Sequence, residues 1–312
     1  MYALLILESQ SYCQNKNDSS KFLGNIIGSY IPSGFGKYWD QVTPENAGKW
    51  GFVGTSTDTS SWNWSYLDSV YHYAVNKGYP FKFHNLLWRQ QQPMWMRKLD
   101  APLQKKMVEA WIRLCGEKYP KTSMVDVVNE PIHKPPFYKD AIGGDGNSGW
   151  DWVIWAFEKA RQAFPDAKLL INDYSILSDS ANTHEYIQII ELLKAKDLID
   201  GIGCQGHGLE KVEPNLIESN LRLLDETGLP IYISEYDVDE STDIKQLEIF
   251  QRQIPIFWND PQVRGITLWG YVQGQTWRPY TYLVRADGTE RPALKWLEEY
   301  VRSNPEGSGK SN

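Results

Sequence analysis

The stretch VDVVNEPIH, residues 125–133, joins a run of β-branched residues to a proline and places a carboxylate where the run stops. Its three valines favour a strand, because β-branched side chains pack well on a pleated surface. Pro131 ends that strand, since proline has no N–H to continue a ladder. Glu130 therefore lies at, or just past, the end of a predicted strand. Taken alone, such a carboxylate has an ordinary explanation, which is that it marks the exit of the chain into solvent.

The same kind of strand recurs along the chain. Strand-like runs occupy residues 22–29, 40–46, 81–88, 124–130, 168–174, 199–207, 230–238 and 264–271. Apolar residues with helical spacing lie between most of them: Leu103, Met107, Ala110, Trp111 and Leu114; Tyr186, Ile189, Ile190 and Leu193; and, less regularly, Leu216, Asn220, Leu221 and Leu224. Eight strands that alternate with helices in 312 residues indicate an α/β fold, a single-domain (β/α)8 TIM barrel. The rival is an open doubly wound sheet, but no GxGxxG motif follows the first strand.

The composition excludes some classes of function. Hydrophobic residues make up 41% and charged residues 23% of the chain, which is typical of a globular protein. The net charge is −7, from 32 Lys and Arg against 39 Asp and Glu, so nothing favours a nucleic-acid partner. The aromatic content is high, with 14 Trp and 18 Tyr. Tryptophan at this density indicates either a large core or platforms that stack on sugar rings.

The ends of the chain contain no recognisable second domain. We expect residues 22–302 to form the barrel, residues 1–21 to be an N-terminal extension and residues 303–312 to be a flexible tail. The apolar run MYALLIL is too short to span a membrane, so no membrane partner is expected. If this run is the remnant of a trimmed signal peptide, the protein is secreted or periplasmic. We expect a monomer.

The cysteine and histidine patterns predict neither a disulfide framework nor a metal site. The chain has three cysteines, Cys13, Cys115 and Cys204, and the last two fall in apolar or helical patterns that suggest buried free thiols. No CxxC pair or His-rich spacing is present. We therefore expect no metal and no cofactor.

The barrel gives a second explanation for Glu130. In this fold, active sites form at the carboxyl ends of the strands. Glu235 lies near the end of the seventh predicted strand, and barrel closure brings it to the same mouth as Glu130. Two facing carboxylates with aromatic walls are what glycoside hydrolysis requires. Other strand ends carry polar or aromatic side chains that a barrel built for stability alone does not need: Glu45, Asn46, His84, Trp88, Asn172, Asp173, Gln205, His207 and Trp269.

Seven separated motifs together resemble the family 10 glycoside hydrolases, the endo-β-1,4-xylanases. The motifs are VTPENAGKW, FKFHNLLW, VDVVNEP, LLINDY, GIGCQGH, ISEYDVD and ITLWG, and the resemblance covers residues 22–302. It implies a (β/α)8 barrel, a retaining double-displacement mechanism, and xylan or xylo-oligosaccharides as the substrate. By this match Glu130 resembles the general acid/base and Glu235 the nucleophile.

The chemistry requires different environments for the two carboxyl groups, since one must be protonated and the other ionised. The resemblance implies a hydrogen-bonded Asp237–His207–Glu235 chain that keeps the nucleophile ionised. A histidine in a barrel can also be purely structural, but glycines flank His207 on both sides and favour function. Glu130 is expected among aromatic side chains, Trp88 and Trp269 included, where desolvation would raise its pKa.

The remaining predicted contacts surround the sugar. Asn129 resembles the residue that hydrogen-bonds the sugar 2-hydroxyl, although a turn-forming asparagine is the alternative. Glu45, Asn46 and Lys49 match the group on the glycone side. Further predicted contacts are His84, Trp88 and Gln91 near that group, Asn172 and Gln205 at strand ends, Trp269 and Trp277 as an aromatic cover, and Tyr174 as a platform on the leaving-group side. Trp269 follows an apolar run and fits a core position equally well.

The chain departs from the family pattern in several places. Arg89 stands where histidine is common, residues 90–92 form a glutamine triplet, and Ala47-Gly48 replaces a larger pair. A long glycine-rich loop, residues 132–150, follows Glu130 and is expected to shape the leaving-group side. Two other functions stay open: a retaining barrel enzyme that acts on β-glucan or mannan, and a carbohydrate-binding barrel without activity.

Overall fold

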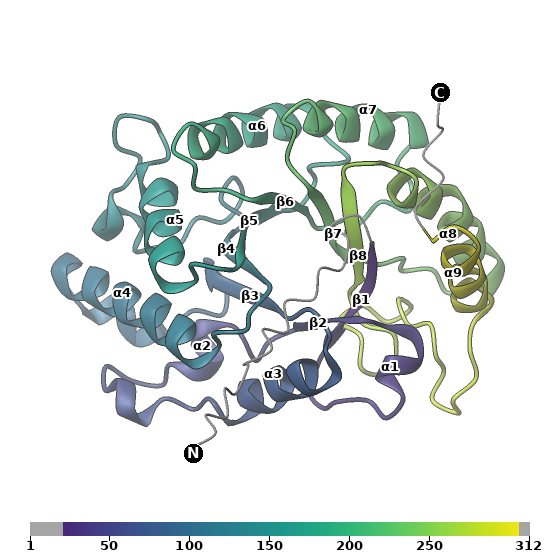
Figure 1. The fold of residues 1–312 in the computed structure, drawn as a ribbon, viewed down its shortest axis with the longest axis horizontal. Coiled ribbons are helices and arrows are strands. Elements are labelled where there is room, and N and C mark those ends of the chain that lie inside the picture. The colour runs from purple at the N-terminus through teal and green to yellow at the C-terminus, as the bar shows by residue number, and fades with distance from the viewer. Residues whose placement is uncertain (1–20, 306–312) are drawn as a thin grey trace, which may run out of the picture.

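Eight parallel strands form the centre of the computed structural model, which describes residues 21–305 (Figure 1). The strands are β1 (Phe22–Ile27), β2 (Gln41–Pro44), β3 (Lys82–Leu87), β4 (Met124–Asn129), β5 (Lys168–Asp173), β6 (Gly201–Cys204), β7 (Ile231–Tyr236) and β8 (Val263–Leu268). Their order is β2-β1-β8-β7-β6-β5-β4-β3, and a parallel bridge between Val42 and Phe81 joins the two ends of this sheet. The predicted TIM barrel is confirmed.

Helices surround the strands as an outer layer, as the view along the barrel shows (Figure 1). The long ones are α3 (Ser65–Lys77), α4 (Ala101–Lys118), α5 (Asp151–Ala163), α6 (Ser180–Lys194), α7 (Pro214–Asp225), α8 (Asp243–Trp258) and α9 (Pro292–Ser303); α1 (Phe35–Tyr38) and α2 (Trp50–Val53) are single turns. Short 3-10 segments span Thr59–Ser61, Met94–Lys98 and Lys139–Ile142. Because helices cover the outside and side chains fill the inside, nearly every strand residue is buried.

The helices predicted from spacing are present, but four of the predicted stripe residues are not fully buried: Leu103, Ala110, Leu114 and Leu216. Helix α4 begins at a cap in which Asp100 Oδ1 accepts from Leu103 N at 3.0 Å. Leu103 itself is 47% exposed, so the buried stripe of α4 starts one turn later, at Met107. In α7 the buried residue is Ile217, and the neighbouring Leu216 is only partly buried. Spacing identified both helices but misplaced these two positions at their first turns.

The first strand and the last helix bound the described barrel. Strand β1 begins at Phe22. Helix α9 extends through Ser303, and Asn304 O accepts a hydrogen bond from Trp258 Nε1 at 2.7 Å. The remainder of the expected tail, and the N-terminal extension up to residue 20 with Cys13, lie outside the described residues.

Two further expectations concern buried thiols and membranes. Cys115 and Cys204 are buried and free. Within residues 21–305, none of the helices combines the length and apolar character that a bilayer-spanning segment needs.

Candidate active site

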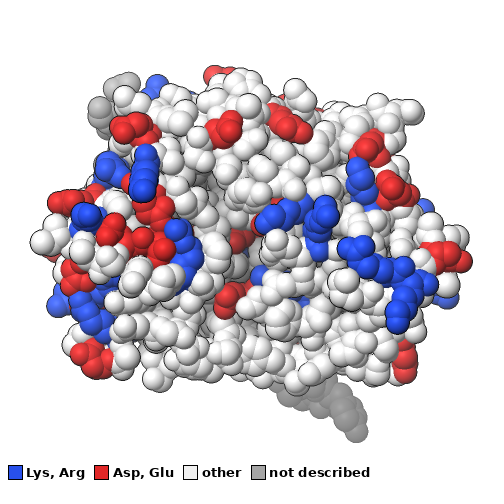
Figure 2. All heavy atoms as spheres, turned by 180° about the vertical axis from the view of Figure 1, so that it is seen from behind, with Lys and Arg blue, Asp and Glu red and all other residues white. Residues whose placement is uncertain are grey.

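A cavity of about 870 Å³ opens at the carboxyl ends of the strands. Seen from behind, the molecule has a hollow at the centre of this view, with acidic side chains inside it and basic side chains beside it (Figure 2). Most of the predicted site residues line this cavity: Glu45, Asn46, Lys49, His84, Trp88, Gln91, Asn129, Glu130, Tyr174, Gln205, His207, Glu235, Trp269 and Trp277. Its wall also contains residues that were not predicted: Gln90, Lys134, Ser175, Gly208 and Arg278.

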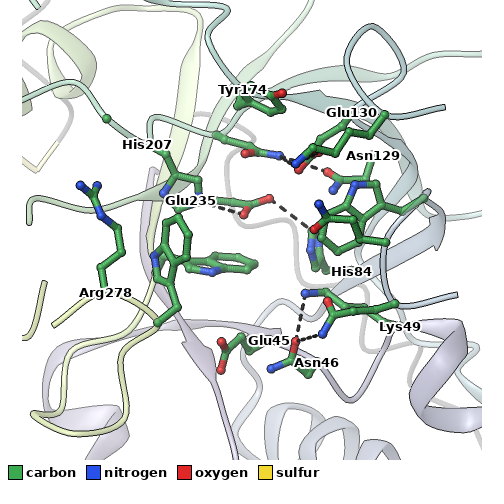
Figure 3. Close-up of a pocket in the computed structure, with 18 of the residues that line it drawn as sticks. Glu45, Asn46, Lys49, His84, Asn129, Glu130, Tyr174, His207, Glu235 and Arg278 are labelled. Atoms are coloured by element: carbon green, nitrogen blue, oxygen red, sulfur yellow. Dashed lines mark hydrogen bonds and ion pairs between the residues drawn. The ribbon is translucent and has the colours of Figure 1, made fainter. Parts of the chain in front are cut away.

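The close-up shows how the cavity is organised (Figure 3). Glu130 and Glu235 reach into it from opposite sides. Glu45, Asn46 and Lys49 lie together at one end, and Tyr174 lies at the other. The two carboxylates therefore stand between a polar group and an aromatic ring.

Glu235 is held in its ionised form by hydrogen bonds and nearby positive charge. It belongs to β7, where its Oε1 accepts from Asn172 Nδ2 at 2.7 Å and its Oε2 lies 3.2 Å from His207 Nε2. Burial acts to raise the pKa of this carboxyl, but His84, His207 and Lys82 outweigh burial and lower the pKa to about 2. Glu235 is therefore a carboxylate at every pH at which the protein would be expected to work.

His207 lies between two carboxylates. Its Nδ1 is 3.1 Å from Asp237 Oδ1, which is a close ion pair without hydrogen-bond geometry, so the expected continuous hydrogen-bonded chain is only half formed. Burial lowers the pKa of His207, but Asp237 and Glu235 raise it to about 10. The imidazolium can therefore donate from Nε2 to Glu235. Asp237 is fixed in turn by Trp277, whose Nε1 donates to Asp237 Oδ2 at 2.6 Å.

A buried charged cluster that was not predicted lies beneath Glu235. His84 Nδ1 is 2.8 Å from Asp126 Oδ2, and Lys82 Nζ is 3.2 Å from the same oxygen. All three side chains are essentially inaccessible to solvent. His84 Nδ1 is also 4.0 Å from Glu235 Oε1, which connects the cluster to the site. The sequence did contain a sign of this cluster. Lys82 and His84 are polar residues two positions apart in an otherwise apolar strand, and that spacing places both side chains on the same face of the strand.

Glu130 lies in the same cavity wall as Trp88 and Trp269, and its own hydrogen bond and ion pair are with polar side chains. It directly follows β4 with a positive φ of 55°, an uncommon conformation for a residue with a side chain. Its backbone N donates to Asn172 O at 2.7 Å and holds the turn. Its carboxylate contacts are polar: Gln205 Nε2 lies 3.2 Å from Oε1, and Lys134 Nζ lies 3.4 Å from Oε2. The two carboxyl groups of the cavity are therefore in distinct environments, one paired with imidazole and the other with an amide and an ammonium.

Three amide side chains connect the carboxylates. Asn172 Nδ2 donates to Asn129 Oδ1 at 2.7 Å as well as to Glu235. Gln205 Nε2 lies 3.4 Å from the same Asn129 oxygen. With its oxygen already accepting, Asn129 has its Nδ2 group left for a ligand. Asn172 was predicted to contact substrate, but it is fully buried and lies below the cavity wall, so it positions Asn129 and Glu235 instead.

The polar end of the cavity is tightly interconnected. Asn46 Oδ1 accepts from Lys49 Nζ and from Gln91 Nε2, both at 3.0 Å. The Lys49 ammonium also lies 4.9 Å from the ring centroid of Trp88. Burial lowers the pKa of Lys49 and raises that of Glu45, although each group opposes the shift of the other.

The aromatic end is built around Tyr174. The Tyr174 ring stacks on His133 with centroids 4.0 Å apart, and Lys134 Nζ lies 5.3 Å from the Tyr174 centroid. His133 Nδ1 is 2.7 Å from Asp173 Oδ1, and this hydrogen bond raises the pKa of His133. The loop after Glu130 thus supplies His133 and Lys134 to this end. Arg89, the departure from the histidine pattern, is exposed and lies outside the cavity wall.

Among residues 21–305, no group of three or more His, Cys, Asp or Glu side chains is placed so that it could hold a metal ion.

Comparisons with known proteins give the family of the chain. The family model described as glycosyl hydrolase family 10 matches residues 7–300. The chain is 39% identical over 284 residues to endo-1,4-beta-xylanase B of Cellvibrio japonicus, covering 89% of this chain and 45% of that protein. It is 28% identical over 280 residues to endo-1,4-beta-xylanase A of Fusarium oxysporum, covering 84% and 83%. The chain thus spans less than half of the first relative and most of the second.

Solved structures share the fold. A GH10 structure from Paenibacillus barcinonensis superposes with a TM-score of 0.80 at 23% identity, covering 91% of this chain and 96% of that one. Xylanase 10B from Thermotoga petrophila, solved in complex with xylobiose, superposes with a TM-score of 0.77 at 24% identity, covering 91% and 94%. At these identities, the structures establish the architecture of the barrel.

Proposed function

This chain belongs to glycosyl hydrolase family 10, and from that premise we propose that it is a retaining endo-β-1,4-xylanase that hydrolyses internal bonds of xylan. The observation that carries the proposal is the pair of carboxylates in one cavity, Glu235 with its pKa lowered to about 2 and Glu130 beside Gln205 and Lys134. Retaining hydrolysis needs two carboxyl groups with different surroundings, because one group attacks as an anion while the other delivers a proton.

The first step forms a covalent intermediate. Glu235 attacks the anomeric carbon while Glu130 gives its proton to the glycosidic oxygen, so the leaving sugar departs as an alcohol and a glycosyl ester forms on Glu235. His207 and Asn172 hold the attacking carboxylate through its two oxygens, one each. This arrangement supports attack by one fixed conformer of Glu235.

The second step returns the enzyme to its starting state. Glu130 is now a carboxylate, because it gave its proton to the leaving sugar, and it takes a proton from water as that water attacks the same carbon and the bond from this carbon to Glu235 breaks. Glu235 leaves as a carboxylate that His207 again stabilises. Two displacements at one carbon preserve its configuration, which is why the product is expected to keep the β configuration.

The sugar next to the cleaved bond is held by amide and aromatic groups. Asn129 has its Nδ2 group available because Asn172 and Gln205 occupy its oxygen, and this supports its assignment as the donor to the 2-hydroxyl. Trp269 and Trp277 flank His207, with ring centroids 6.0 and 4.9 Å from the imidazole. Their position supports an aromatic cover over the sugar ring.

The direct test is release of reducing sugar from purified xylan, compared with carboxymethylcellulose and mannan. We expect hydrolysis of xylan well above the other two, and loss of that hydrolysis in Glu235→Gln. The matched control is Glu299→Gln, the same change at an exposed position of α9. Faster hydrolysis of carboxymethylcellulose or mannan than of xylan would mean that the protein is a β-glucan- or mannan-degrading enzyme instead. Binding of xylan without any release of sugar would mean that the barrel is a binding module.

A further inference from the structure

The loop after Glu130 brings a lysine back onto the Glu130 carboxylate. Pro131 follows Glu130 directly, and the backbone N of Lys134 donates to Glu130 O at 2.7 Å, which closes a single tight turn. This turn folds the lysine side chain toward the glutamate, so that Lys134 Nζ lies 3.4 Å from Glu130 Oε2. Lys134 lines the catalytic cavity, yet neither step of the proposed hydrolysis uses its ammonium.

The two carboxylate oxygens of Glu130 have different surroundings. Oε1 accepts from Gln205 Nε2 at 3.2 Å. Oε2 is buried and has no hydrogen-bond partner among residues 21–305, since its contact with Lys134 is an ion pair without hydrogen-bond geometry. Because Oε1 already accepts from an amide N–H, the proton of the acid form belongs on Oε2. Lys134 therefore lies beside the oxygen that exchanges the proton.

The ion pair is shielded from water on the glutamate side. The Glu130 side chain is 7% exposed, and that of Lys134 is 34% exposed. Ion pairs between fully exposed side chains contribute little, but a positive charge beside a buried carboxylate is screened less. Lys134 Nζ also lies 5.3 Å from the ring centroid of Tyr174, so the ammonium contacts both the acid/base and the aromatic ring on the leaving-group side.

Other titratable groups surround Glu130 on all sides of the cavity: Lys49, His84, His133, Tyr174, His207 and Glu235. Lys49, His133 and Tyr174 interact electrostatically with the Glu130 carboxylate. Lys134 is the cation in direct contact with it. Because all the other groups remain when Lys134 is replaced, a variant at this position isolates the effect of the ammonium.

A positive charge beside Oε2 acts in opposite directions on the two steps. In the first step the proton passes from Oε2 to the glycosidic oxygen, and the ion pair with Lys134 forms, so the charge favours this transfer. In the second step the carboxylate takes a proton from water and the ion pair is lost, so the same charge opposes that transfer. Lys134 keeps its own proton in both steps.

We propose that Lys134 is a positioning residue for the acid/base: its ammonium holds Oε2 of Glu130 and favours the carboxylate form, which speeds departure of the leaving sugar and slows hydrolysis of the glycosyl ester. This proposal rests on the proposed function. It describes an enzyme adapted to a difficult first step, as when the leaving group is a sugar and not an acidic phenol.

The test compares phenyl xylobioside, whose leaving group needs a proton, with 2,4-dinitrophenyl xylobioside, whose leaving group does not. In Lys134→Met and Lys134→Gln, kcat/KM for the phenyl glycoside should fall about twofold to threefold below the basic limb of its pH profile. The limb itself should move to higher pH by about half a unit to one unit. The dinitrophenyl glycoside should keep its kcat/KM.

The second step is measured on the isolated 2-fluoroxylobiosyl enzyme as it regains activity in buffer. Since a neutral residue no longer opposes proton uptake by Glu130, both variants should reactivate about twofold to threefold faster than the wild type. Lys134→Arg keeps a positive charge and should return all of these values toward the wild type. The matched control is Lys121→Met, the same change at an exposed position before β4, which should leave every value unchanged.

The outcomes separate the two proposals. A basic limb and a leaving-group dependence that stay at wild-type values in both neutral variants overturn the role of Lys134 and leave the xylanase assignment intact. Equal losses on the two glycosides, slower reactivation of the ester, or a higher KM with unchanged kcat also contradict it, since Lys134 would then support the fold or contact the sugar. So does Lys134→Arg behaving as the neutral variants do. A wild-type chain that cleaves neither xylan nor the glycosides fails as a xylanase, and the role of Lys134 fails with it.

Discussion

His207 lies between Glu235 and Asp237, 3.2 Å from the first carboxylate and 3.1 Å from the second. Asp237 also accepts from the indole of Trp277, which lines the cavity, so this part of the wall is linked to Glu235 through Asp237 and His207. Because the two carboxylates outweigh burial and raise the pKa of His207 to about 10, the imidazole carries a positive charge at neutral pH. That charge is one of the causes that lower the pKa of Glu235 to about 2.

Replacing His207 by Asn should lower kcat and move the acidic limb of the kcat/KM profile to higher pH. The amide can still donate to Glu235, but the positive charge is lost, so the pKa of Glu235 rises from about 2 and protonation removes the nucleophile at a higher pH. We expect kcat to fall about tenfold or more, since each 1.4 kcal/mol of lost transition-state stabilisation is tenfold in rate. His184→Asn, on the exposed face of α6, is the control. Unchanged turnover with only a weaker KM would show that His207 acts on the sugar instead.

The buried lysine below the site should matter for stability and for pH dependence. Lys82→Met leaves Asp126 without its ammonium partner in the barrel interior, where His84 is the other side chain that contacts it. Breaking a buried ion pair in this way typically costs about 3–5 kcal/mol of folding free energy. The positive charge of Lys82 also helps to lower the pKa of Glu235, so the acidic limb should shift upward as in the His207 variant. Urea unfolding and a pH–rate profile measure both effects, with the exposed Lys77→Met as the control; no change in either would contradict the role of this cluster.

Some of the site could be predicted from sequence because strand ends identify the mouth of a barrel. Glu130 and Glu235 were located by their position at the ends of two predicted strands, and both line the cavity. Asn172 was also at a strand end, but strand position does not specify depth, and the side chain is buried below the wall.

The unpredicted parts depend on contacts between strands or between loops. His84 meets Asp126 because β3 and β4 pair with these two residues in register, and register between separate strands cannot be read from either segment. Lys134 reaches Glu130 because the chain turns immediately after β4, with the left-handed backbone at Glu130.

Loss of the acid should be tolerated when the leaving group needs no proton. Glu130→Ala is expected to cleave an aryl xylobioside with an acidic phenol far better than it cleaves xylan, and azide should increase turnover by replacing water as an anionic nucleophile. Glu235→Ala should lose activity on both substrates, since no ester can form. Equal losses on the activated and natural substrates in the Glu130 variant would count against its assignment as the acid/base.

An acidic pair far from the cavity should make stability depend on pH. Burial, followed by the negative charge of Asp260, raises the pKa of Asp225 from 3.8 to about 7. The folded pKa is higher than the unfolded one, so this carboxyl costs the fold stability as pH rises from 4 to 7. Asp225→Asn should therefore raise the melting temperature at pH 8 and leave it unchanged at pH 4. Because solvent screens the partly buried Asp225, we expect the gain in folding free energy at pH 8 to be only roughly 1 kcal/mol, which corresponds to a rise of about 2 °C in melting temperature.

The control for this prediction is Asp166→Asn, the same change at an exposed position, which should leave the melting temperature unchanged at either pH. A stabilisation of Asp225→Asn that is equal at pH 4 and pH 8 would show that removal of a charge is not its cause.

The stereochemistry of the first product tests the central claim, that Glu235 is a nucleophile, most directly. Retaining enzymes place their two carboxyl groups about 5–5.5 Å apart so that one can bond the anomeric carbon, whereas inverting enzymes leave roughly 6.5–9.5 Å for a water. Proton NMR of xylohexaose hydrolysis, recorded before mutarotation, distinguishes the two outcomes from the anomeric signals. Double displacement through Glu235 predicts that the β-anomer appears first and the α-anomer follows by mutarotation. Initial release of the α-anomer would contradict it.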